Sequence, residues 1–225
     1  MALEYEVHPL LVLVGAFNPQ IMRNPQWIKN FLFPNSSQKN ITVNMNLPLL
    51  GGELSSTMTI DGIRIQTEAG KVQIFPKEFT ASGYKALAEV VVNLASALPH
   101  TPLVAYGINC RFGEVSSKPL LLKMAGVRRI FASDLTNDNL KLEYAINYKA
   151  AKMTVSVIEN KMTDSFKISY TFNFHFQMDE NEKSPMARLK EAILDGAIED
   201  YLQHAHEVAE SISSNLTSGK RGNNA

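Results

Sequence analysis

Polar side chains that could bind a partner or take part in catalysis alternate with aromatic ones along residues 166–177. Alternation with a period of two is typical of a strand with one face in the core and the other in water. The aqueous face of this strand would carry Lys167, Thr171, Asn173 and His175. A histidine there could act as a general base, but a solvated strand supplies no fixed carboxylate to tune its pKa. We therefore interpret His175 first as a surface side chain.

Two further segments are expected to extend this polar face. Strands over 103–112 and 140–148 would place amide and cationic side chains beside those of 166–177. The resulting candidate face consists of Asn109, Arg111, Asn147, Lys149, Lys167, Thr171, Asn173 and His175. A hydrolase or nucleotide-binding enzyme built on this face would use His175, Arg111 and Lys167.

The other histidines give no metal or catalytic pattern. His204 and His206 stand two positions apart in a predicted helix, so their side chains diverge by about 200° and cannot share one metal ion. Asp200 and Glu210 lie four positions from them, which favours ordinary surface pairs. The sequence contains no HExxH, Walker A, GxGxxG or GxSxG motif. We predict no catalytic residue, no metal site and no cofactor.

The single cysteine, Cys110, excludes an internal disulfide and a four-cysteine zinc site. It falls on the apolar side of the strand expected over 103–112, in phase with Tyr106, Ile108 and Phe112. That phase predicts a buried structural thiol, not a nucleophile.

Composition and charge limit the class of protein. The 225 residues are 45% hydrophobic, enough for a full core, and their formal net charge is zero. Zero net charge disfavours a dedicated nucleic-acid binder or a protein that docks on anionic membranes. No stretch approaches the roughly 18 apolar residues of a membrane helix, and Glu4 and Glu6 stand where a secretory signal needs positive charge. We expect a cytoplasmic protein without a membrane segment.

The elements that must position these side chains occur in the same order in two halves. Residues 1–99 are expected to contain a strand, a helix, four strands and a helix, over 10–17, 25–33, 41–47, 57–60, 63–68, 71–75 and 80–98. Residues 100–217 repeat that order over 103–112, 118–125, 127–132, 140–148, 153–158, 166–177 and 185–215, the last being a long C-terminal helix. Residues 218–225 are polar and are expected to be a disordered tail.

Local signals give the boundaries of these elements. Asn24-Pro25 and Ser184-Pro185 are typical helix starts, and Asp61-Gly62 is typical of a two-residue hairpin turn. The fold class is therefore α+β, with two β-α-β-β-β-β-α halves that form one curved antiparallel sheet with helices on one face. The polar face of that sheet would stay open.

This order of elements resembles the duplicated saddle of the TATA-binding-protein-like fold. The resemblance implies a binding surface on the sheet. It implies no particular activity, because that fold hosts unrelated functions.

Three short segments resemble an uncharacterised, sporadically distributed group of bacterial proteins. They are VGAFNP at Val14–Pro19, the helix that contains Trp27, and HTPLVAYGIN at His100–Asn109. The resemblance implies no catalytic residue. The sporadic distribution of the group implies a mobile-element or phage-defence context.

The leading hypothesis is a non-enzymatic binding or adaptor protein with a protein partner. One alternative is a chaperone that resembles the antiparallel-sheet export chaperones, and another is a hydrolase or nucleotide-binding enzyme that uses the candidate face. A homodimer is also compatible with the sequence, because an open sheet leaves two unpaired edge strands.

Overall fold

The computed structural model describes residues 3–8, 10–38, 41–46, 54–121, 139–179 and 183–218. The described strands are β1 (Glu4–Tyr5), β2 (Leu11–Gly15), β3 (Thr42–Asn46), β4 (Ser55–Ile60), β5 (Ile63–Glu68), β6 (Lys71–Phe75), β7 (Leu103–Ser116), β8 (Asn139–Tyr148), β9 (Ala151–Lys161) and β10 (Phe166–Gln177). The described helices are α1 (Pro19–Met22), α2 (Pro25–Leu32), α3 (Ala81–Ala97), α5 (Pro185–Leu194) and α6 (Ala197–Ser218). Within these ranges, no helix is long and apolar enough to cross a membrane.

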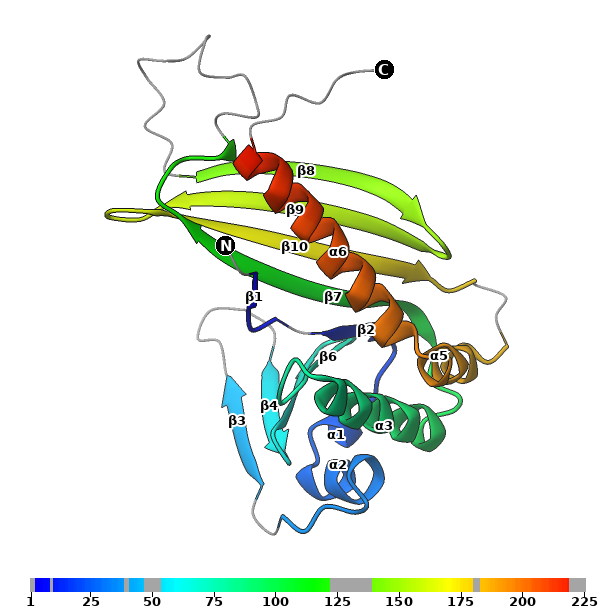
Figure 1. Ribbon diagram of the computed structural model, residues 1–225. Coiled ribbons are helices and arrows are strands. Elements are labelled where there is room, and N and C mark those ends of the chain that lie inside the picture. Colours follow the sequence, from blue (N-terminus) through cyan, green and yellow to red (C-terminus); the bar gives the residue numbers. More distant parts are fainter. Residues whose placement is uncertain are drawn as a thin grey trace.

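All ten described strands belong to one antiparallel sheet (Figure 1). Its strand order is β3-β4-β5-β6-β2-β7-β10-β9-β8, and the short strand β1 pairs with β7 beside β2. The fold is therefore α+β with a single antiparallel sheet, as the alternating segments predicted.

One face of the sheet is apolar along its whole width. A row of directly opposed residues crosses seven strands, and each member is at most 2% exposed: Met58, Ile65, Ile74, Leu11, Ile108, Phe174 and Met153. Helices α5 and α6 lie over this face of β7 and β10, and α3 packs against both helices (Figure 1). Burial of this face supplies the main stabilising free energy of such a sheet.

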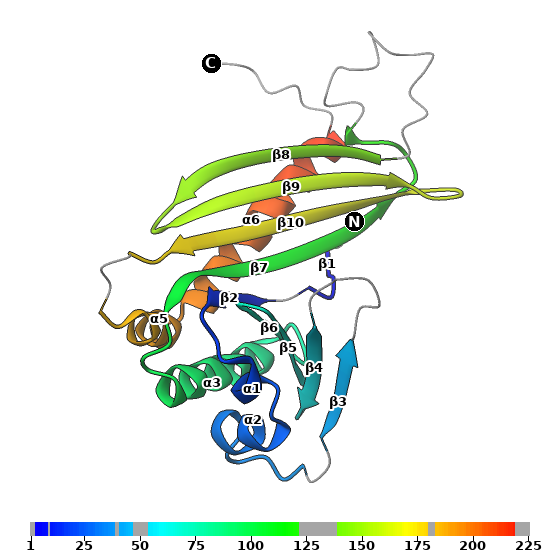
Figure 2. The ribbon, with the colours of Figure 1, turned by 180° about the vertical axis from the view of Figure 1, so that it is seen from behind.

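The opposite face of β7 to β10 has no described helix over it, as the reverse view shows (Figure 2). Along β10 the six side chains from Phe166 to Phe176 in even positions point to the helices, and the odd positions point away. The bounds of β10, β5 and β6 equal those predicted from the sequence.

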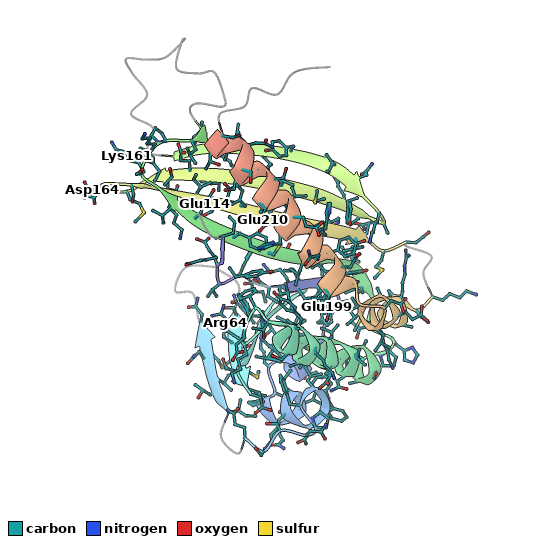
Figure 3. The ribbon with its side chains drawn as sticks, viewed as in Figure 1. Arg64, Glu114, Lys161, Asp164, Glu199 and Glu210 are labelled. Atoms are coloured by element: carbon teal, nitrogen blue, oxygen red, sulfur yellow. The ribbon has the colours of Figure 1, made fainter. Side chains whose placement is uncertain are left out.

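Two carboxylates are buried on the apolar face, and both stand opposite Ile168, one on each neighbouring strand. Glu114 accepts hydrogen bonds from the Tyr170 hydroxyl and from Ser213 Oγ of α6, the latter at 2.9 Å; Figure 3 labels Glu114 beside α6. Glu159 Oε2 accepts from the backbone N–H groups of Leu120 and Leu121 at 2.6 and 3.0 Å. These bonds satisfy the buried charges and fasten α6 and the end of the β7 connection to the sheet.

The predicted two-residue turn at Asp61-Gly62 is confirmed. Ile60 pairs with Ile63, and both turn residues have positive φ, 49° at Asp61 and 83° at Gly62. Glycine and aspartate tolerate that region, which is required for a tight turn between twisted strands.

The single helix predicted over 185–215 is wrong. The chain forms two helices, α5 and α6, separated at Asp195-Gly196. Gly196 has a φ of 81°, a left-handed conformation that ends a right-handed helix. The periodic apolar pattern continues across the break, so periodicity alone did not show it.

The repeat of two identical halves is observed only in part. Residues 1–99 contain β2, α1 and α2, β3 to β6 and α3, in the predicted order, with β1 and α1 as additions. In the second half, β7, β8, β9 and β10 precede α5 and α6. The predicted strand over 127–132, most of the predicted helix over 118–125, and residues 219–225 lie outside the described residues. The duplicated-saddle arrangement stays a prediction.

Replacing Gly196 by alanine should destabilise the protein by about 1–2 kcal/mol, because a Cβ is strained at this φ even though no atom lies within 4 Å of its position. Urea denaturation followed by circular dichroism measures the change. Gly107→Ala is the control: its Cβ would meet only ordinary contacts of 3.6 Å or more, and the expected change is below about 1 kcal/mol. Equal stability of Gly196→Ala and the native protein would contradict a left-handed hinge.

Cys110 should resist thiol reagents until the protein unfolds. The residue is fully buried in the core, as its phase predicted, and this burial raises the pKa of its thiol. Reaction with a disulfide reagent at neutral pH should therefore be negligible without denaturant and complete in concentrated urea. Rapid labelling of the native protein would show that β7 opens or that the thiol is exposed.

Candidate binding face

Seven of the eight residues of the candidate face lie together on the side of the sheet that has no described helix over it. Strand β7 contributes Asn109 and Arg111, and β8 contributes Asn147. Strand β10 contributes the other four, Lys167, Thr171, Asn173 and His175. Cross-strand pairing therefore gathers side chains that are up to 66 positions apart in the sequence, as the register of Asn173 with Asn109 and of Thr171 with Arg111 shows.

The strand register arranges these residues in rows. His175 stands opposite Lys152 of β9, and Lys152 stands opposite Asn147 of β8. In the neighbouring rows Asn173 lies between Asn109 and Thr154, and Thr171 lies between Arg111 and Ser156. The face thus combines amides, hydroxyls and cations on four adjacent strands.

Two buried polar atoms of this face have no hydrogen-bond partner among the described residues. They are Oδ1 of Asn109, a residue that is 4% exposed, and Oγ of Ser156, which is 9% exposed. Asn173 and His175 beside them are exposed. Buried polar atoms are nearly always satisfied in folded proteins, so the two orphan atoms mark hydrogen-bonding capacity that the described residues do not use.

A carboxylate from the N-terminal segment joins the cations of the face. Glu6 Oε1 lies 2.6 Å from Lys167 Nζ, and its Oε2 lies 4.0 Å from Arg111 Nε and 3.4 Å from Ser169 Oγ, which donates to it. The Arg111 Nε donates a hydrogen bond to Thr171 Oγ1 at 3.1 Å. The cations are therefore held in place instead of extending freely into water.

Gly113 makes this arrangement possible. A Cβ built at Gly113 would lie 2.5 Å from Glu6 Oε1. The absence of a side chain at Gly113 therefore leaves room for the Glu6 carboxylate to cross β7. Glu6 could not be found from the sequence because its contacts with Lys167 and Ser169 span more than 160 positions. The only local signal was a glycine in the middle of a strand, which often marks a close approach.

His8 lies half-buried beside this cluster. Its pKa is lowered, first because burial disfavours the charged imidazole and second because Arg111 repels it, while Glu6 opposes the shift. The folded protein therefore binds a proton at His8 less readily than the unfolded chain does.

Lys149, the eighth predicted residue, does not join the face. It occupies the turn between β8 and β9 with a φ of 50°, and its ammonium pairs with Asp200 of α6. The same ammonium lies 5.5 Å from the centre of the Tyr148 ring. A two-residue turn directs this side chain to the helix side of the sheet.

His204 and His206 point to different neighbours, as their spacing predicted. The ring of His204 stacks on Tyr148 at 3.7 Å, whereas His206 meets the edge of Phe112 and lies 3.8 Å from Glu210 Oε1. Among the described residues, no three histidine, cysteine or acidic side chains are grouped as metal ligands.

The structure gives His175 no catalytic environment within the described ranges. Its Nε2 contacts Gln177 Oε1 at 3.3 Å, and the ring is exposed. An exposed amide neighbour does not orient an imidazole as a carboxylate does.

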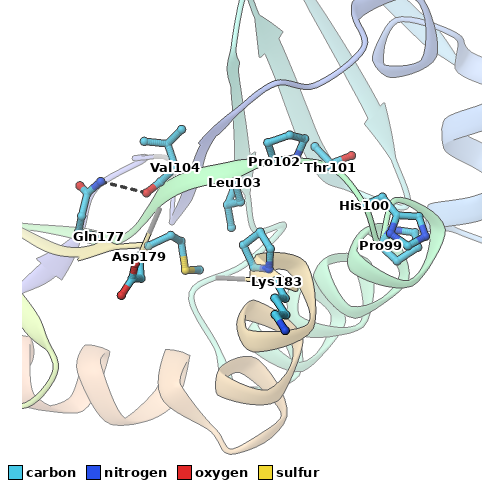
Figure 4. A pocket seen from close by; sticks show the side chains of 11 residues that line it. Pro99, His100, Thr101, Pro102, Leu103, Val104, Gln177, Asp179 and Lys183 are labelled. Carbon is cyan, nitrogen blue, oxygen red and sulfur yellow. Dashed lines mark hydrogen bonds between the residues drawn. The ribbon is translucent and has the colours of Figure 1, made fainter. Parts of the chain in front are cut away.

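A cavity of about 510 Å³ lies near the end of the candidate face, where the connection from α3 to β7 meets the connection from β10 to α5 (Figure 4). His100, Thr101 and Lys183 contribute polar groups to its wall. Gln177 Nε2 closes one side by donating to the Val104 carbonyl at 3.2 Å. The wall lacks a convergent set of buried polar groups in the described residues, so we assign it no chemistry.

Comparison with known proteins gives no relative: no family model, no curated protein and no solved structure matches this chain.

The lowered pKa of His8 predicts how stability depends on pH. The unfolded chain takes up the histidine proton near pH 6.5, while the folded protein takes it up only at lower pH, so stability should fall as pH drops through 6.5 towards the lowered value. His8→Asn should lose less stability than the native protein between pH 7.5 and that range, as measured by urea denaturation. Val7→Asn, at an exposed neighbouring position, should keep the native dependence. Identical pH profiles for His8→Asn and the native chain would contradict this assignment.

Proposed function

We propose that the protein is a non-enzymatic binding protein whose partner is another protein that docks on the candidate face. The observation that carries this proposal is a polar sheet face with no described helix over it, on which Asn173 and His175 are exposed. A partner that docks there would form hydrogen bonds with the exposed Asn173 amide and His175 ring.

The charge of the face favours a protein partner over a nucleic acid. Arg111 and Lys167 lie beside Glu6, and Lys141 pairs with Glu143 on the same side of the sheet, so both signs are present, and the whole chain has zero net charge. Nucleic-acid sites gain most of their affinity from uncompensated cations that replace counterions on phosphates. Mixed charges and amides are typical of the polar parts of protein interfaces.

The biological setting of the partner rests on sequence resemblance alone. The segments Val14–Pro19 and His100–Asn109 and the helix of Trp27 resemble a sporadically distributed bacterial group. On that resemblance we propose that the partner belongs to a mobile-element or phage-defence system.

Two substitutions to arginine test the docking surface. Asn173→Arg places a large cation at the exposed centre of the face, and Ser211→Arg makes the same change at an exposed position on α6. A partner captured from the native host by the unmodified protein is purified and titrated against each variant by calorimetry. We expect Asn173→Arg to weaken binding at least about tenfold, or about 1.4 kcal/mol, and Ser211→Arg to leave it unchanged.

Equal binding by both variants would overturn docking on this face. A small molecule turned over by the native protein and not by His175→Ala would instead support the hydrolase alternative. Suppression of aggregation of a model client, unaffected by Asn173→Arg, would support the chaperone alternative.

A further inference from the structure

Strand β8 is the terminal strand of the sheet within the described residues, and it is ten residues long. The other terminal strand, β3, has five residues. A long edge strand presents a row of unpaired backbone groups to other chains, and natural proteins usually shorten, cover or pair such an edge. The long edge of β8 is therefore expected to be paired or covered, whereas the short edge of β3 is not.

The β8–β9 hairpin fixes which backbone groups face outward. Tyr148 pairs with Ala151 across a two-residue turn, so this closing pair and every second pair before it exchange hydrogen bonds within the hairpin. The N–H and C=O groups of the alternate residues point to the open edge. Those residues are Lys141, Glu143, Ala145 and Asn147.

The apolar side of β8 extends beyond the cover of α6. Tyr144 and Ile146 are 41% and 51% exposed, although they continue the apolar face of the sheet. Their cross-strand neighbours on β9, Val155 and Met153, are at most 2% exposed. Exposed apolar side chains directly beside an open backbone edge form a surface that a paired strand would cover.

The charges on β8 favour pairing with a strand of complementary charge. Lys141 and Glu143 occupy the polar side of the strand, form an ion pair at 2.5 Å, and belong to the set with outward backbone groups. A lysine on an edge strand usually prevents pairing with other chains. The same lysine would promote pairing with a strand that places a carboxylate opposite it.

We propose that two copies of this chain pair antiparallel through β8, about a two-fold axis at Leu142. In this register Lys141 of each copy lies opposite Glu143 of the other, which forms two ion pairs. Leu140 lies opposite Tyr144 of the second copy, and the two Leu142 side chains meet on the axis. Lys141 and Glu143 are also the residues that exchange backbone hydrogen bonds in this register, which is the pattern that an antiparallel ladder requires.

Neighbouring registers are less complementary. An axis at Glu143 places that carboxylate opposite itself, and an axis at Ala145 places Glu143 opposite Asn147, so that no ion pair forms. Like charges directly opposed in a sheet are destabilising. An axis at Tyr144 pairs Lys141 with Asn147 and leaves the charge pairs unused.

The dimer would have one continuous sheet with both sets of helices on the same side. The candidate faces of the two copies would then adjoin on the other side and could act together on one partner. The dimer does not depend on the proposed function, because β8 pairing uses the edge of the sheet and not its polar face.

Sedimentation velocity and light scattering on the full chain, over a dilution series, test this interface. The native protein is expected to be a dimer. Lys141→Glu and Glu143→Lys should each raise the dimer dissociation constant about tenfold or more, because each puts like charges opposite one another twice. The double variant Lys141→Glu/Glu143→Lys should restore the native value, since it regenerates both pairs.

Two further variants separate the interface from folding. Ala145→Pro removes an outward-facing N–H group and should produce a folded monomer by circular dichroism, whereas Asn44→Glu on the other edge strand, β3, should leave the dimer intact. A monomeric native protein, or a dimer that survives Ala145→Pro, overturns pairing through β8. Failure of the double variant to restore the dimer overturns the register at Leu142.

Discussion

The fourteen-residue strand β7 is the element on which the rest of the structure depends. One edge of β7 pairs with β2 and β1, and the other edge pairs with β10 along residues 105–116. Strands from both parts of the chain thereby form one sheet with one continuous apolar face. Because that face is continuous, helices from both parts pack on the same layer, and the polar side chains collect on the opposite side of β7 to β10.

Contacts between distant segments give this polar side its character. Glu6 crosses β7 at Gly113 and holds Lys167 and Arg111, so the cations have a fixed partner before any ligand arrives. The side chains of Asn173 and His175 are exposed on the same face. A face with compensated charges and exposed polar groups is suited to recognition by hydrogen bonding more than to long-range attraction.

The buried polar groups on the two sides of the sheet differ in their hydrogen bonding. On the helix side, Glu114 and Glu159 are buried but fully engaged by hydroxyl or backbone donors, so they fasten elements together. On the open side, the buried Asn109 Oδ1 and Ser156 Oγ have no hydrogen-bond partner among the described residues. The asymmetry follows from α6, which brings Ser213 to Glu114 and has no counterpart on the open side among the described elements.

The sequence by itself determined the local elements whose pattern is complete within a few residues. The alternation along 166–177 gave β10 with its bounds and both its faces, Asp61-Gly62 gave a hairpin, and the phase of Cys110 gave its burial. Three features were decided only by the tertiary structure: the break at Gly196, the direction of Lys149, and the contact of Glu6 with Lys167. Each of these features depends on a backbone angle or on a partner far along the chain. Neither a backbone angle nor a distant partner leaves a periodic signal in the sequence. Hydrophobic periodicity shows which side of an element is buried. The strand order and register decide which polar residues lie together on the exposed side.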